Sequence, residues 1–286
     1  MLYEKISGFS DEIAEDIDTQ FATLNKLGIS YFEPRGINGK NISTLNDDEV
    51  EQLKQKMEEY GIKASSIGSP IGKIRITVDF EPHFEVYKRV VKTAKMLDCK
   101  YIRMFSFFKD GEWTEEKIKE VKSRLSKLIE YAKLEDVILL HENEGDIYGE
   151  TIEGNLDIMQ SLYCDNFKMV FDPANFAQKD VDTIKAIETL LPYVEYMHIK
   201  DHKKGKGIVP AGFGDGNVLY VMNKLFAKGY KGFFSLEPHL GYFKGLADLE
   251  LDGKSKMEAD ASADTFTLAA NCFNDLLKVA LENRGN

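Results

Sequence analysis

Short apolar runs alternate with longer amphipathic stretches along the whole chain. The apolar runs have strand length and are bounded by polar or turn residues, as expected for strands buried in a parallel sheet. The predicted strands span residues 3–10, 29–33, 62–67, 100–105, 137–142, 167–172, 194–198 and 232–237. Apolar residues at helical spacing predict helices over 17–27, 46–60, 82–97, 114–133, 150–162, 181–190, 216–228 and 260–282.

Turn and cap residues support these boundaries. Asn46 is followed three positions later by Glu49, which is typical of a helix N-terminus, and Gly28 and Gly61 follow predicted helices where a left-handed residue is common. No linker, low-complexity tract or break in composition divides residues 1–286, so one domain is predicted. Eight strands alternating with eight helices predict the α/β class and a closed (β/α)8 TIM barrel.

A doubly wound open sheet is the alternative fold. Such nucleotide-binding sheets carry a G-x-G-x-x-G motif after the first strand, and none follows the first predicted strand here. The glycines between Gly205 and Gly216 follow the seventh predicted strand and lack a Walker lysine pattern. We interpret that segment as an active-site loop.

Composition narrows the classes of partner. Of 286 residues, 43% are hydrophobic and 30% charged, and 37 basic against 48 acidic residues give a net charge of −11, which disfavours a broad nucleic-acid surface. The three cysteines lie far apart with no CxxC pair, so neither a disulfide framework nor a zinc knuckle is expected. No apolar stretch approaches the roughly 20 residues of a membrane span, and the N-terminus lacks signal-peptide features. We predict a cytoplasmic protein without membrane or nucleic-acid partners.

Four successive predicted strands end in a residue that can bind a divalent metal. These residues are Glu142, Asp172, His198 and Glu237. The C-terminal ends of parallel strands meet at one rim of a closed barrel, where barrel enzymes carry out their chemistry. Any one of the four could be an ordinary polar residue leaving a strand, but four in consecutive units favour a site. Three oxygens and one nitrogen suit one divalent ion, Mn²⁺, Mg²⁺, Co²⁺ or Zn²⁺.

The segments around these residues carry a family resemblance. They resemble motifs of the xylose-isomerase-like sugar isomerase/epimerase superfamily, and they read Leu140-His141-Glu142-Asn143, Phe171-Asp172-Pro173-Ala174-Asn175, His198-Ile199-Lys200-Asp201 and Leu236-Glu237-Pro238-His239. Ser10-Asp11-Glu12 and the segment 69–73 also resemble that group. The resemblance implies a single metal held by the four ligands, with Glu142 and Glu237 moving a proton next to a carbonyl. It also implies a small sugar, keto-sugar or polyol derivative as substrate.

Further polar residues are expected around the mouth of the barrel. Those predicted to bind substrate are Lys200, Asn175, Asn143, Arg35, Lys73 and His202. Asn175 and Glu144 stand where relatives often have histidines, and Glu33, Arg103 and His239 could also reach the mouth. Strand alternation turns His141 toward the helices as a hydrogen-bonded structural residue, and His83 is expected to be incidental. The aromatic residues Phe105, Phe107, Phe108 and Trp113 are expected either to pack the core and rim or to form a wall beside a sugar.

Other functions remain open at this stage. A dehydratase of a keto-inositol or similar cyclic polyol would use the same metal site, and a barrel that only binds a sugar would need no catalysis. An apurinic-site endonuclease shares the barrel ancestry, but its three-metal site needs many histidines and this chain has five. The polar segment 240–259 is expected to be a mobile lid or an oligomer contact, and a homo-oligomer is a further expectation.

Overall fold

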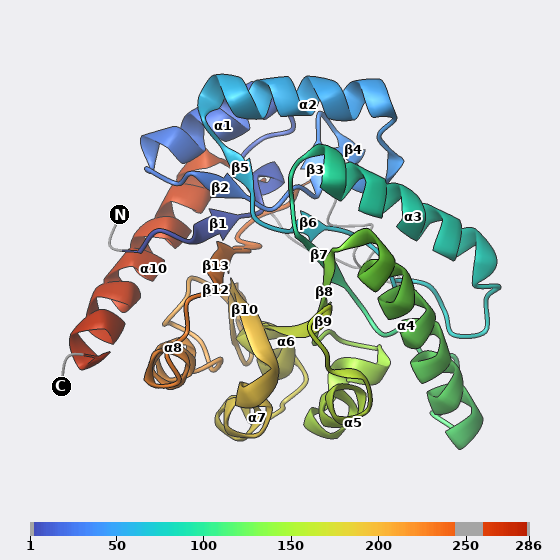
Figure 1. Ribbon diagram of the computed structural model, residues 1–286. Coiled ribbons are helices and arrows are strands. Elements are labelled where there is room, and N and C mark those ends of the chain that lie inside the picture. Colours follow the sequence, from blue (N-terminus) through green and yellow to red (C-terminus); the bar gives the residue numbers. More distant parts are fainter. Residues whose placement is uncertain (1–2, 244–259, 285–286) are drawn as a thin grey trace.

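Parallel strands line the centre of the molecule and helices surround them (Figure 1). The computed structural model describes residues 3–243 and 260–284. Seven strands form one parallel sheet in the order β1-β13-β10-β9-β8-β7-β6. Their bounds are β1 Ile6–Gly8, β6 Ile67–Gly68, β7 Tyr101–Met104, β8 Ile138–Glu142, β9 Phe167–Phe171, β10 Val194–Ile199 and β13 Phe233–Leu236.

A short parallel pair fills the remaining side of the ring. It consists of β2 (Tyr31–Phe32) and β5 (Lys63–Ala64), which leads directly into β6. The amide of Glu33 donates to the carbonyl of Gly8 at 2.9 Å, which joins this pair to β1. The strands therefore follow one another around the ring in chain order, and the predicted α/β barrel is confirmed.

The helices agree with the amphipathic pattern and lie outside the strands (Figure 1). In α2 the Asn46 side chain and Glu49 form a complete capping box, and Gly61 ends the helix with a φ of 66°. The apolar residues of each helix are buried against the sheet, as an outer layer requires. The bounds are α1 Ile17–Lys26, α2 Asp47–Tyr60, α3 Glu81–Met96, α4 Glu115–Glu135, α5 Ile152–Leu162, α7 Thr183–Leu190, α8 Val218–Ala227 and α10 Ala263–Arg284.

Several short elements were not predicted from the pattern. Two antiparallel hairpins join β3 (Gly36–Ile37) to β4 (Lys40–Asn41) and β11 (Asp201–Lys203) to β12 (Gly207–Val209). A short helix, α6 (Pro173–Gln178), begins directly after Asp172. Elements of two to six residues are too short to show a period, and all three lie in loops at the ends of barrel strands.

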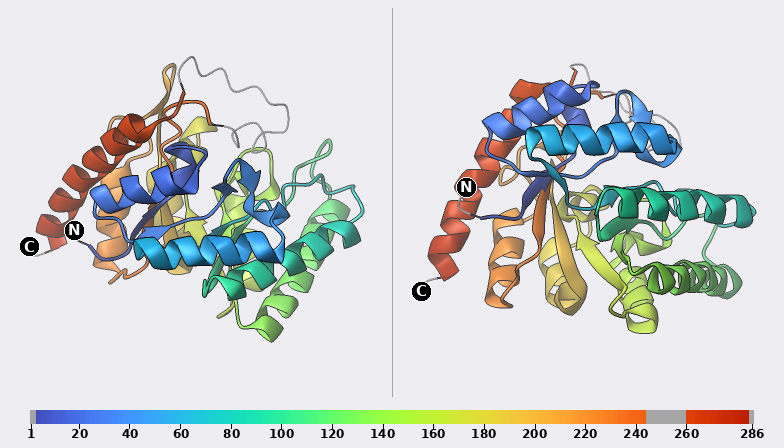
Figure 2. Two further views of the ribbon diagram at one scale, coloured as in Figure 1. Left: turned by 90° about the horizontal axis from the view of Figure 1, so that it is seen from above. Right: turned by 45° about the horizontal axis from the view of Figure 1, so that its top comes forward.

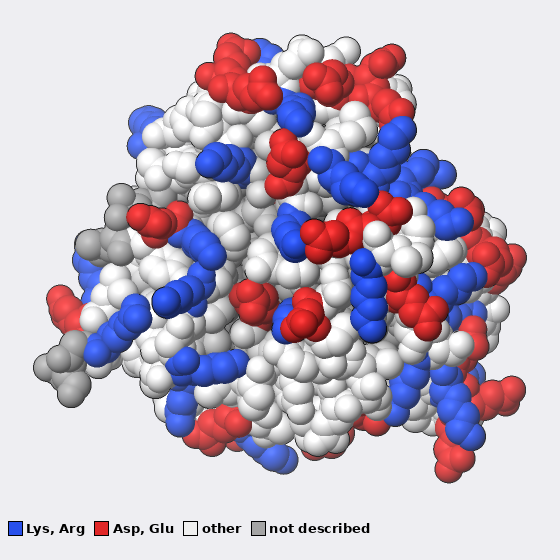
Figure 3. All heavy atoms as spheres, viewed as in Figure 1, with Lys and Arg blue, Asp and Glu red and all other residues white. Residues whose placement is uncertain are grey.

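The chain ends and the surface complete the outline. The N- and C-terminal ends lie on the same side of the barrel, where α10 packs beside α8 (Figures 1 and 2). Most of the predicted lid or oligomer contact, residues 244–259, lies outside the described residues. On the face shown in Figure 3, basic and acidic side chains are interspersed. Within the described ranges, no helix is both long and apolar enough to cross a membrane.

Candidate metal centre

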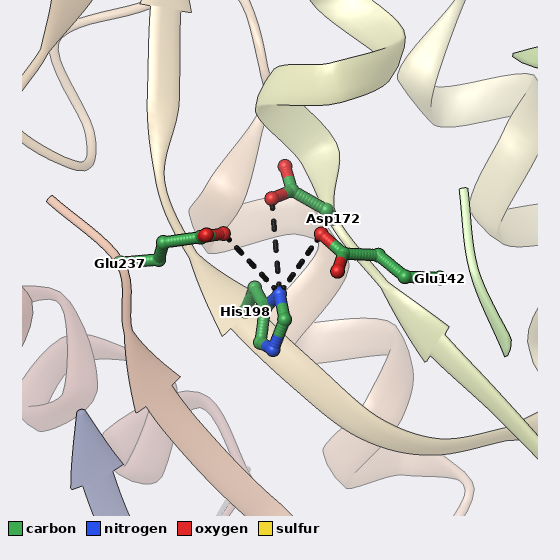
Figure 4. Close-up of side chains that lie close together, drawn as sticks. All are labelled: Glu142, Asp172, His198 and Glu237. Atoms are coloured by element: carbon green, nitrogen blue, oxygen red, sulfur yellow. Dashed lines mark hydrogen bonds and ion pairs between the residues drawn. The ribbon is translucent and has the colours of Figure 1, made fainter. Parts of the chain in front are cut away.

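The four predicted ligands converge at one rim of the barrel. Glu142 ends β8, Asp172 follows β9, His198 lies in β10 and Glu237 follows β13, and these four strands are consecutive neighbours in the sheet. Because neighbouring strands are parallel, their C-terminal ends bring the side chains together. All four side chains are buried, and they point toward one another (Figure 4).

The spacing of their donor atoms fits a single divalent ion. Nδ1 of His198 lies 3.0 Å from Glu142 Oε1, 3.3 Å from Glu237 Oε2 and 4.0 Å from Asp172 Oδ2. One ligand atom from each residue lies within 4.8 Å of all the others. Metal–ligand bonds of about 2.0–2.3 Å separate adjacent ligand atoms by roughly 3–4.5 Å. The cluster could therefore hold a metal ion, as the sequence predicted.

Three buried cations contact the ligand carboxylates. Arg103 donates to Glu142 Oε2 at 3.1 Å, and Arg35 donates to Glu237 Oε1 at 3.1 Å. Lys200 lies 2.9 Å from Glu237 Oε2 and 2.9 Å from Asp172 Oδ2. The contact with Glu237 is an aligned hydrogen bond, whereas Asp172 Oδ2 accepts no aligned hydrogen bond within the described residues. These cations offset the repulsion among the three carboxylates.

The same neighbours separate the acidities of the three carboxyl groups. Burial raises the pKa of Asp172 to about 7, although Lys200 acts in the opposite direction. Burial also acts to raise the pKa of Glu142, but His198 and Arg103 outweigh it and lower that pKa to about 2. Lys200 and His239 likewise outweigh burial and hold the pKa of Glu237 well below its ordinary value. Both glutamates are therefore ionised at neutral pH.

Two asparagines predicted to bind substrate fix the ends of the ligand strands. The Asn143 amide donates to the carbonyl of Asp172 at 2.8 Å and accepts from its backbone N–H at 2.9 Å. The Asn175 amide donates to Glu142 Oε1 at 3.1 Å and to the carbonyl of Asn143 at 2.9 Å. Asp172 Oδ1 accepts from the amide of Asn175 and so caps α6. These contacts position Glu142 and Asp172 relative to each other.

Arg35 lies at the centre of a buried ionic cluster. Its guanidinium donates to both oxygens of Asp11, to Glu12 Oε1 at 3.0 Å and to Glu237 Oε1. The ring of Phe9 lies 4.3 Å from its Cζ. Every edge of the guanidinium is thus engaged with protein. Sequence reasoning placed Arg35 at the mouth but missed its acidic partners, although Asp11 and Glu12 directly follow the first strand.

His239 and His202 occupy the rim differently. Nε2 of His239 lies 3.4 Å from both Glu12 Oε1 and Glu237 Oε1. His202 lies on the β11–β12 hairpin, and its Nδ1 has no hydrogen-bond partner among residues 3–243 and 260–284. The neighbouring Asp201 carboxylate accepts from the amides of Gly212, Gly214 and Gly216, each at 2.9 Å. Asp201 therefore shapes the glycine-containing loop that the sequence assigned to the active site.

Lys73 is held at the mouth by a loop that depends on His83. The Lys73 ammonium lies 3.1 Å from Glu144 Oε2 and 4.5 Å from the centre of the Phe105 ring. Nε2 of His83 accepts the backbone N–H of Gly72 at 2.8 Å. Gly72 has a φ of 89°, and a Cβ there would lie 2.0 Å from the carbonyl oxygen of Phe105. His83, which was expected to be incidental to the site, thus has a structural contact, because its ring accepts a hydrogen bond from the loop that carries Lys73.

This anchor predicts a stability difference in acid. Burial, with a smaller contribution from Arg124, lowers the pKa of His83 to about 4. A depressed folded-state pKa stabilises the fold above the unfolded pKa of about 6.5, and this stability is lost as the pH falls toward 4. Between pH 7 and pH 5, wild type should lose about 1–2 kcal/mol more unfolding free energy than His83→Gln, the lower end allowing for solvent screening. Urea unfolding at both pH values measures this, and equal losses would contradict it.

The remaining predicted side chains lie away from the four ligands. His141 is fully buried and lies against Gly149, as expected for a structural residue. Neither ring nitrogen has a hydrogen-bond partner in the described part of the chain, so the expected hydrogen bond is not found. Phe105 and Phe108 pack with Ile147 in a small buried cluster. Trp113 lies edge-to-face with Tyr148, with ring centres 5.2 Å apart, in the lining of a separate surface pocket.

Comparison with known proteins decides the family. The sequence model described as "Xylose isomerase-like TIM barrel" matches residues 21–259. The chain belongs to this family. No curated protein sequence matches the chain significantly.

Solved structures share this xylose isomerase-like fold over nearly their whole length. An L-ribulose 3-epimerase superposes with a TM-score of 0.75 at 17% identity, covering 98% of this chain and 95% of the other. The probable 3-DHS dehydratase AsbF from Bacillus anthracis gives 0.73 at 15% identity, covering 94% and 98%. The IOLI protein, solved with a bound zinc atom, gives 0.74 at 17% identity, covering 96% and 99%. These similarities establish the fold of the xylose isomerase-like barrel described above.

Proposed function

We propose that this protein is a metal-dependent sugar isomerase or epimerase that moves a proton next to a carbonyl. The observation that carries the proposal is the pairing of two ionised, buried glutamates in one four-residue cluster. Glu142 and Glu237 come from β8 and from the end of β13, and they approach His198 from opposite sides (Figure 4). A substrate carbon between them would have one carboxylate toward each face.

The chemistry requires a base, an acid and stabilisation of negative charge on the carbonyl oxygen. A divalent ion held by Glu142, Asp172, His198 and Glu237 would polarise the carbonyl and stabilise an enediolate. One glutamate oxygen would remove the proton from the adjacent carbon. The other glutamate is ionised at rest, so it would first take up a proton, which the Lys200 ammonium hydrogen-bonded to Glu237 could supply, and then pass it to the opposite face or to the neighbouring carbon. Arg103 binds Oε2 of Glu142, and Arg35 binds Oε1 of Glu237. Each arginine thereby orients the second oxygen of its glutamate, the one that would move the proton.

The polar lining supports a small polyhydroxylated substrate. Two buried lysines provide hydrogen-bond donors. Lys200 forms ion pairs with Asp172 and Glu237 of the cluster, and Lys73 forms one with Glu144. Hydroxyl and carbonyl oxygens of a keto-sugar can accept from such donors. The L-ribulose 3-epimerase among the structural neighbours supports a ketose.

A dehydratase is the second candidate, favoured by the position of Lys200. Its reaction begins with the same proton removal next to the carbonyl. The enediolate then expels a β-hydroxyl group, which leaves as water after gaining a proton. The Lys200 ammonium, 2.9 Å from both Asp172 and Glu237, could supply that proton. A probable dehydratase among the neighbours supports this reading.

The test is solvent exchange with a panel of substrates. Protein loaded with Mn²⁺ is incubated in D2O with free ketoses and inososes, and products are analysed by NMR and mass spectrometry. We expect deuterium next to the carbonyl of at least one compound, with a changed configuration for an epimerase or loss of one water for a dehydratase. Metal binding without exchange into any compound would contradict catalysis and support a sugar-binding barrel.

A further inference from the structure

We infer that Glu33 is a positioning residue that sets the ring orientation of His198, an inference that rests on the metal site of the proposed function. The two ring nitrogens of His198 face opposite surroundings. Nδ1 faces the ligand carboxylates of Glu142 and Glu237 at 3.0 and 3.3 Å. Nε2 lies 3.3 Å from Oε2 of Glu33, on the side away from the cluster.

Glu33 is a buried carboxylate with an unusual set of partners. Its side chain is fully buried, and among the described residues its ion pairs within 4 Å include no lysine or arginine. His198 is the basic group that it faces. A buried carboxylate without a cation costs several kcal/mol unless its neighbours compensate for lost solvation. A role in orienting the His198 imidazole would account for a buried carboxylate at this position.

A hydrogen-bonded chain holds Glu33 from behind. The hydroxyl of Tyr196 donates to Glu33 Oε2 at 2.9 Å, and it lies 2.9 Å from Oγ of Ser65. The amide of Glu33 donates to Gly8, which anchors its backbone in the ring of strands. The carboxylate is therefore fixed relative to β10, the strand that carries both Tyr196 and His198.

The His198 ring is also confined by packing. The ring of Phe9 meets it edge-to-face with centres 5.2 Å apart, and Tyr196 meets it nearly perpendicularly at 5.8 Å. Within the described residues Nε2 of His198 has no aligned hydrogen bond. Since it lies 3.3 Å from Glu33 Oε2, a small rotation of either side chain would align an Nε2–H hydrogen bond to the Glu33 carboxylate.

A carboxylate at this position stabilises the metal-binding form of the ring. With a metal ion on Nδ1 the ring proton lies on Nε2, and the Glu33 carboxylate would accept a hydrogen bond from it. Loss of such a partner of a ligating histidine typically weakens metal binding by about 10- to 100-fold. Among the described residues, the Glu33 side chain contacts Tyr196 and His198 and none of the three carboxylate ligands. Its effect on metal binding would therefore pass through His198.

The test uses Zn²⁺ as the probe and two readouts other than activity. Competition with a chelating dye gives the zinc affinity, and ¹H–¹⁵N NMR of the five histidines in the zinc-loaded protein reports whether Nε2–H of His198 is hydrogen-bonded. Glu33→Leu should bind zinc about 10- to 100-fold more weakly, and in the zinc-loaded variant the Nε2–H signal of His198 should lose the downfield shift that a hydrogen bond to a carboxylate gives it. Glu33→Gln, which keeps an oxygen acceptor but loses the charge, should fall between wild type and Glu33→Leu. This second variant keeps the test open if Glu33→Leu does not fold.

Glu195 provides the matched control. Its carboxylate also accepts from a tyrosine hydroxyl, that of Tyr101 at 2.8 Å, but it lies near the start of β10. Glu195→Gln should leave both the zinc affinity and the Nε2–H signal of His198 unchanged. Wild-type affinity and an unchanged Nε2–H signal in both Glu33 variants would overturn the inference. Strong zinc binding by wild type without turnover of any sugar would instead count against the proposed function and leave the role of Glu33 intact.

Discussion

Replacing either Glu142 or Glu237 by glutamine should lower turnover at least about a thousandfold while the barrel remains folded, since each variant removes a proton-transfer group. Glutamine keeps the size of the side chain and can still accept from Arg103 or Arg35, so the local packing should persist. The measurement is the rate of deuterium exchange into the best substrate, together with a melting curve for each variant.

A loss of metal could produce the same loss of rate, so metal content must be measured as well. At a Mn²⁺ concentration that saturates each variant, the deficit should remain if the carboxylate itself moves the proton. Glu195→Gln is the matched control, because the Glu195 carboxylate accepts from Tyr101 near the start of β10 and does not belong to the four-residue cluster. Near wild-type exchange in either Glu142→Gln or Glu237→Gln would end the assignment of these residues.

Arg35→Met should cause the largest loss of stability, about 3–5 kcal/mol of unfolding free energy, because removing one partner of a buried ion pair leaves uncompensated charge. Here the loss would leave Asp11, Glu12 and Glu237 without their shared cation. The guanidinium is only 2% exposed, so water cannot replace it without rearrangement. Urea unfolding of wild type and variant at pH 7 measures the difference.

Arg75→Met is the control for this variant. Arg75 is about half exposed, and its ion pair with Asp110 is long at 3.8 Å. An exposed pair of this kind contributes at most about 1 kcal/mol. If Arg35→Met proved as stable as Arg75→Met, the buried cluster would not depend on its arginine, and Arg35 would be available to bind substrate as the sequence suggested.

The barrel and the four candidate ligands could be predicted because both follow from period and spacing. Each βα unit repeats a buried strand and an amphipathic helix, and residues at the ends of successive parallel strands must lie at one rim. Glu142 and Asp172 are therefore neighbours in space although they are 30 residues apart in the chain. This proximity requires only that the two strands are parallel, whatever their exact register.

The partners of these ligands depend on packing that the pattern does not contain. Arg35 and Glu237 meet because β1 and β13 pair at the closure of the ring, more than 200 residues apart in the chain. The contact between Glu33 and His198 depends likewise on the heights along the barrel axis at which β2 and β10 place these two residues. His83 could not be linked to Gly72 from sequence, since the link is a single hydrogen bond across a loop.

The central claim is that four residues from consecutive strands hold one divalent ion. Crystals of the protein grown with Mn²⁺ and measured at the manganese absorption edge test it most directly. We predict one strong anomalous peak per chain, bonded to Glu142, Asp172, His198 Nδ1 and Glu237. An ion bound elsewhere, or no peak between these four side chains at saturating Mn²⁺, would contradict the account.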